Sequence, residues 1–102
     1  LSSERRELIS VSRNQFGWIG LVFTKMSGGP VLVEHLSPSG PLARLGPGKI
    51  QRGDMIHQIG MVRCESVYAV DSLYVTKHLI KGDPGSKVWL LVSREFTGNW
   101  DP

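Results

Sequence analysis

Apolar and polar residues alternate along six short stretches of the chain, which is the pattern of strands with one buried face. The last stretch is the clearest, because Val88, Leu90 and Val92 fall on one face while Lys87 falls on the other. Clusters of Gly, Pro and Ser lie between the stretches and predict turns. The six strands are expected at residues 5–12, 19–26, 31–36, 55–59, 61–64 and 86–94.

Two helices are expected between these strands. Residues 41–46 predict a single turn that begins with Pro41 and ends at Gly46, which is the favoured placement of these two residues. Ser72 is a suitable N-cap for a longer helix that runs through Lys81. Helical spacing turns four residues of this longer helix inward: Leu73, Thr76, Leu79 and Ile80.

This order of elements predicts a mainly β fold, a small and partly open β barrel or sandwich of five or six strands capped by two α-helices. The 102 residues are enough for one domain with one core. We expect the domain at residues 5–94, an N-terminal extension at 1–4 and a tail at 95–102, where no periodicity is found. Because the chain has no starting Met and no signal peptide, we expect it to be a piece of a longer protein.

Composition argues against several classes of function. The net charge of +3 is mild, so no nucleic-acid partner is expected. Cys64 is the single cysteine, which excludes an internal disulfide, and no metal-ligand spacing surrounds it. We therefore expect no metal and no cofactor. We also expect a reducing, cytoplasmic location, where partner proteins could bring the chain to the inner face of a membrane.

The run Ile19-Gly20-Leu21 opens the second predicted strand and is the main candidate binding feature. Glycine has no Cβ, so a ligand can approach the backbone there closely. Adjacent N–H groups of such a turn can bind an anion, including the carboxylate that ends a peptide chain. An edge strand behind the turn can pair with an added peptide strand. The tripeptide alone is equally compatible with the start of any buried strand.

Several segments together resemble a PDZ domain over residues 5–94. Ile19-Gly20-Leu21 falls where that family has its Gly-Leu-Gly-Phe loop, with Trp18 in place of the first glycine. A Gly-Pro-Leu-Ala run occupies residues 40–43, and the most specific segment is Gly53-Asp54-Met55-Ile56. The run at residues 82–88 is similar to PDZ modules of carboxy-terminal processing proteases.

The resemblance implies that a partner's carboxy-terminal tail adds as an antiparallel strand between the second strand and the longer helix. The N–H groups of Ile19, Gly20 and Leu21 would then hold the terminal carboxylate. Arg13 would assist through water, or is a solvated loop arginine. The ligand-binding residues that the resemblance implies are Arg13, Trp18, Ile19, Gly20, Leu21, Val22, Phe23, Thr24, Leu73, Lys77 and Ile80.

Ligand selectivity follows from the side chains at these positions. The pocket for the last ligand residue is apolar, with Leu21, Phe23 and Ile80, so that residue should be hydrophobic, although such residues also build a core. Leu73 at the helix start predicts a hydrophobic residue two before the ligand's end, unless the helix register places Ser72 there. Lys77 would favour an acidic ligand, or is simply solvated.

The leading interpretation is a non-enzymatic peptide-binding module of a scaffold or signalling protein, a monomer or a weakly self-associating one. The alternative is a substrate-recognition or regulatory PDZ domain of a protease whose catalytic domain lies elsewhere. A catalytic pair of Cys64 with a histidine is disfavoured, because a cysteine in a short strand usually behaves as a small apolar residue. Weak contact with anionic lipid is a secondary expectation, since the charge is small and the tryptophans are scattered.

Overall fold

The computed structural model describes residues 3–25, 30–64 and 72–96. Its strands are β1 (Ser3–Ser12), β2 (Leu21–Lys25), β3 (Val31–Leu36), β4 (Met55–Ile59), β5 (Val62–Arg63) and β6 (Lys87–Phe96). All six match strands expected from the alternation, with ends that differ by a few residues.

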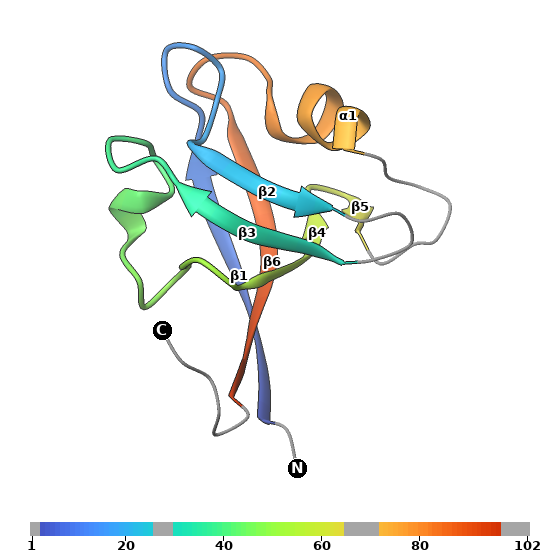
Figure 1. Cartoon of the computed structure of the whole chain (residues 1–102). Coiled ribbons are helices and arrows are strands. Elements are labelled where there is room, and N and C mark those ends of the chain that lie inside the picture. Colours follow the sequence, from blue (N-terminus) through green and yellow to red (C-terminus); the bar gives the residue numbers. More distant parts are fainter. Residues whose placement is uncertain (1–2, 26–29, 65–71, 97–102) are drawn as a thin grey trace.

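The strands form one antiparallel sheet in the order β1-β6-β4-β3-β2, with β5 paired to β4 (Figure 1). The long pair β1–β6 sets Ile9 opposite Leu90 and so aligns the buried positions of both strands. At the other end of the order, β2 pairs with β3. Within the described residues, β2 therefore has one side without a neighbouring strand, where an added strand can pair.

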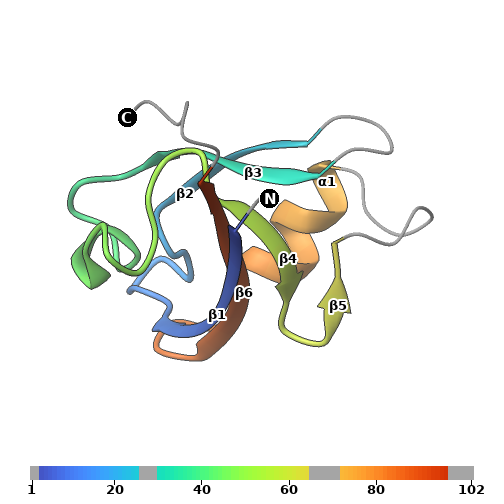
Figure 2. The same ribbon diagram turned by 90° about the horizontal axis from the view of Figure 1, so that it is seen from below.

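The core lies inside the curve of this sheet, and the helix lies near β2 in both views (Figure 1 and Figure 2). Alternate residues of β6 are buried, as the pattern predicts: Val88, Leu90 and Val92. The largest fully buried apolar side chains come from strands, loops and the helix alike: Ile19, Leu42, Ile50, Ile56, Ile59, Ile80 and Leu90. Burial of such side chains supplies most of the free energy of folding.

The helices depart from the prediction of two α-helices. The first is a 3₁₀ turn at Ala43–Leu45, because only a few residues separate the break at Gly40 from Gly46, which ends the turn at φ +90°. The second has one α turn, α1 (Ser72–Tyr74), and continues as a π-helix over Val75–Ile80. No helix among the described residues has both the length and the apolar character needed to cross a membrane.

The wider π winding changes which helix residues point inward. Val75, Leu79 and Ile80 are buried, whereas Leu73 is 63% exposed and does not face the core as its spacing predicts. The Lys81 N–H donates to the Thr76 carbonyl at 3.1 Å, a separation of five residues instead of four. A period of 3.6 residues therefore misplaces the side chains of this helix.

Candidate functional site

An open groove of about 660 Å³ runs between β2 and the end of the helix. Leu21, Val22 and Phe23 form the side contributed by β2, and Thr76 and Lys81 form the side contributed by the helix. Phe16 and Trp18, from the loop before β2, complete the lining. Most of these side chains are apolar, so the groove suits an extended ligand with at least one hydrophobic side chain.

The loop that leads into β2 is fixed by close backbone packing. Gly20 has φ +79°, and a Cβ built on it would lie 3.0 Å from the Cα of Gly40. The Gly20 carbonyl accepts a hydrogen bond from the Ser37 N–H at 2.9 Å, and the Ile19 carbonyl accepts one from the Leu42 N–H at 3.1 Å. Both loop carbonyls are thus held by the segment at 37–42, which fixes the orientation of the peptide units between them.

The N–H groups of Ile19 and Gly20 meet no acceptor among the described residues. The neighbouring Trp18 N–H is different, because it donates to the Asn14 side-chain oxygen at 3.1 Å. A buried N–H without an acceptor costs stability, so such groups are normally paired with protein, water or a ligand. These two adjacent donors lie in the chain between Trp18 and Leu21, which line the groove, and are therefore suited to an anionic oxygen.

Arg13 is used to hold the C-terminal end of the helix. Its Nε donates to the Ile80 carbonyl at 2.8 Å and its Nη2 donates to the Leu79 carbonyl at 3.0 Å. Its Nη1 donates to the Ser86 hydroxyl at 2.9 Å. Cations stabilise the negative end of a helix and satisfy its last carbonyls. Each guanidinium nitrogen therefore already has an acceptor, and the predicted water-mediated contact with a ligand stays a prediction.

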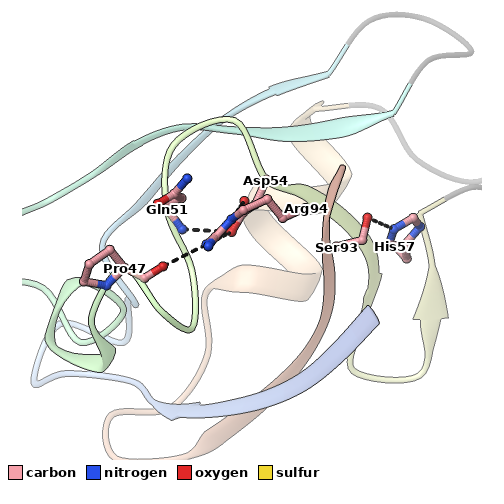
Figure 3. Close-up of polar contacts among 6 residues, drawn as sticks. All are labelled: Pro47, Gln51, Asp54, His57, Ser93 and Arg94. Carbon is pink, nitrogen blue, oxygen red and sulfur yellow. Dashed lines mark hydrogen bonds and ion pairs between the residues drawn. The ribbon is translucent and has the colours of Figure 1, made fainter. Parts of the chain in front are cut away.

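A second polar cluster lies outside the groove, at the ends of β4 and β6 (Figure 3). Asp54 is 1% exposed and accepts two hydrogen bonds from Arg94, at 2.8 and 3.0 Å, and one from the Gln51 N–H at 2.9 Å. The hydrogen bond with Asp54 raises the pKa of Arg94, more than its partial burial lowers it. Arg94 also donates to the Pro47 carbonyl at 2.8 Å, so this cluster braces the chain around residues 47–54.

Cys64 and His57, one of the three histidines considered for catalysis, are buried away from the groove lining, whereas His35 and His78 are exposed. His57 Nε2 lies 2.6 Å from the Ser93 hydroxyl (Figure 3), and Cys64 is 1% exposed. The described residues contain no group of three His, Cys, Asp or Glu side chains that would hold a metal ion. The burial of Cys64 fits its interpretation as a small apolar residue of the core.

Four of the eleven predicted site residues line the groove. Trp18, Leu21, Val22 and Phe23 line it, and Ile19 and Ile80 are buried in the adjoining core. Thr24 is exposed on β2 beyond the lining, where its hydroxyl donates to a Glu34 oxygen at 3.0 Å.

Two helix residues of the predicted site lie outside the groove lining. Leu73 and Lys77 are exposed and absent from the groove lining, whereas Thr76 contributes to it. Lys81 and Phe16 also line the groove and were missed. Phe16 is a large apolar side chain two residues before Trp18, and that proximity was the available signal.

Comparison with known proteins identifies the fold. No protein-family model matches the chain, and no curated protein matches its sequence. Among solved structures, the fourth PDZ domain of MUPP1 is similar, with a TM-score of 0.69 and 16% sequence identity. The match covers 92% of this chain and 79% of that chain. The likeness confirms the PDZ fold that the sequence motifs predict.

Proposed function

We propose that this chain, as a domain with the PDZ fold, is a non-catalytic module that captures the free carboxy-terminal tails of partner proteins by β-strand addition. The observation that carries the proposal is the pair of N–H groups of Ile19 and Gly20, which have no acceptor among the described residues. A terminal carboxylate is the anion that can bind there while its own chain continues along β2.

Strand addition also explains the apolar lining. Successive side chains of an added strand point to opposite faces, so every second ligand residue enters the groove. The last ligand residue would lie against Leu21, Phe23 and Trp18, which form the apolar part of the lining. We therefore keep the expectation of a hydrophobic last residue.

Thr76 lines the groove, whereas Leu73 and Lys77 do not. We therefore propose Thr76, in place of Leu73, as the residue that contacts the ligand residue two before its end, and we do not propose the preference for an acidic ligand that Lys77 suggested. A threonine oxygen can accept a hydrogen bond as well as donate one, and its methyl group is small. We expect Thr76 to favour a Ser or Thr of the ligand over a large apolar residue.

We place the module in a scaffold or signalling protein of the cytoplasm. The protease alternative depends on the run at residues 82–88. In this fold, that run forms backbone hydrogen bonds with Arg13. The Ser86 carbonyl accepts from the Arg13 N–H at 2.8 Å, and the Gly85 N–H donates to the Arg13 carbonyl at 2.9 Å. The run therefore has a structural role in this fold, and a protease parent stays the alternative.

The experiment is an NMR titration of the ¹⁵N-labelled domain with a pool of free-acid peptides that end in Val, Ile, Leu or Phe. Binding as proposed shifts the amide resonances of Ile19, Gly20 and residues 21–25, and leaves the distant β5 resonances of Val62 and Arg63 in place. A pool that binds but shifts only resonances outside the groove, or no binding by any member, would contradict the proposed function.

A further inference from the structure

Arg13, which the sequence marks as the cation near the carboxylate loop, donates from Nε and Nη2 to the carbonyls of Ile80 and Leu79. These bonds fix the guanidinium plane, because the two donors form a rigid fork. Arg13 therefore neutralises the negative end of the helix, and its geometry is set by that task.

Lys81 follows the helix directly and lines the groove together with Phe16, Trp18 and Leu21. Its location is fixed by the backbone on both sides. The Lys81 N–H donates to the Thr76 carbonyl at 3.1 Å, and the next residue, Gly82, donates its N–H to the Gly17 carbonyl at 3.0 Å. Gly17 lies two residues before Ile19, so the base of the Lys81 side chain is held beside the loop with the unpaired N–H groups.

The Lys81 side chain is also available. Lys81 is exposed, and it forms no ion pair or side-chain hydrogen bond with any other described residue. The side chain has four flexible carbons and ends in a compact charge with three donors. It can therefore move to an anion that arrives in the groove, whereas Arg13 would first have to release the helix carbonyls.

We propose that Lys81 is the cation that pairs with the terminal carboxylate of the ligand, while Arg13 is a positioning residue that fixes the helix end against the loop. The proposal rests on the proposed function and assigns a residue to its anion site. The Ile19 and Gly20 N–H groups would bind one side of the carboxylate, and the Lys81 ammonium would approach from the helix side.

The test compares three variants with the wild-type domain: Lys81→Met, Lys81→Arg and Lys77→Met. Lys77→Met is the matched control, because Lys77 is an exposed lysine of the same helix outside the groove lining. The probes are the tightest-binding free-acid peptide from the pool above and the same peptide with an amidated end. Affinities are measured by calorimetry at about 0.05 M and about 0.5 M NaCl, over which a charge contact is strongly screened.

We expect Lys81→Met to weaken binding of the free acid about five- to tenfold at low salt, with a much smaller loss at high salt. Lys81→Arg should restore most of the affinity, and Lys77→Met should leave it unchanged. Equal affinities for Lys81→Met and wild type, or equal losses in Lys81→Met and Lys77→Met, would overturn the assignment of Lys81. A wild-type domain that does not distinguish acid from amide would instead overturn the proposed function and with it this assignment.

Discussion

The N–H of Gly82 donates a hydrogen bond to the carbonyl of Gly17 at 3.0 Å, which joins the end of the helix to the loop before β2. Gly17 has φ +74°, and a Cβ placed on it would overlap the Gly82 carbonyl oxygen. The junction between the helix end and the loop before β2 therefore depends on two backbones in direct contact. This contact sets the distance between the candidate anion site and Lys81.

Gly17→Ala should destabilise the domain by about 2–4 kcal/mol, because the substitution combines a left-handed backbone with a direct collision. Gly60→Ala is the matched control, since Gly60 has φ +58° with no heavy atom within 4 Å of an added Cβ. It should cost only about 1 kcal/mol. Urea denaturation measures both values, and equal losses would show that the Gly17–Gly82 contact does not constrain the fold.

Asp54→Ala should destabilise the domain by about 3–5 kcal/mol, because it leaves the Arg94 guanidinium without its buried partner. Lys49→Ala is the control, since its pair with Glu7 at 3.1 Å is exposed on both sides and should contribute about 0–1 kcal/mol. Chemical denaturation of each variant gives the comparison. A loss for Asp54→Ala as small as that for Lys49→Ala would exclude a structural role for the pair.

The alkaline pH dependence of this pair follows from the raised pKa of Arg94. A pKa that is higher in the folded state contributes stability that is complete below the ordinary arginine value and is lost as pH rises through the folded value. The contribution of Arg94 to the free energy of unfolding should therefore be constant throughout the neutral and moderately alkaline range. The measurement is the difference in unfolding free energy between wild type and Arg94→Met at several pH values. A decrease of this difference from neutral to moderately alkaline pH would contradict the prediction.

Thr76→Val should change ligand selectivity, because it replaces the hydroxyl in the groove with a methyl group of similar size. The variant should lose about 0.5–1.5 kcal/mol of its preference for Ser or Thr over Val two residues before the ligand's end. Leu73→Ala is the control, as Leu73 is exposed outside the groove lining. Two peptides that differ only at that residue give the affinity ratio by fluorescence polarisation. If the affinity ratio changed for Leu73→Ala but not for Thr76→Val, Leu73 and not Thr76 would be the residue that contacts this ligand position.

The sequence predicts the strands well because alternation reports directly which residues of a strand are buried. The alternate residues Val88, Leu90 and Val92 of β6 are buried and show this clearly. The helix register is harder, since π winding depends on tertiary contacts such as the hydrogen bonds from Arg13 to the carbonyls of Leu79 and Ile80. Those contacts join residues more than sixty positions apart, so no local pattern contains them. The helix side of the groove is accordingly lined by Thr76 and Lys81, which the local pattern did not single out for the site.

The central claim is capture of a free chain terminus, and titration calorimetry with a matched pair of peptides tests it most directly. One peptide is a free acid with a hydrophobic last residue, and the other differs only by amidation of its end. We predict micromolar affinity for the acid, about −8 kcal/mol, and no measurable binding of the amide. Equal affinity for the two peptides would contradict the account, because the N–H groups of Ile19 and Gly20 would then not be the anion site.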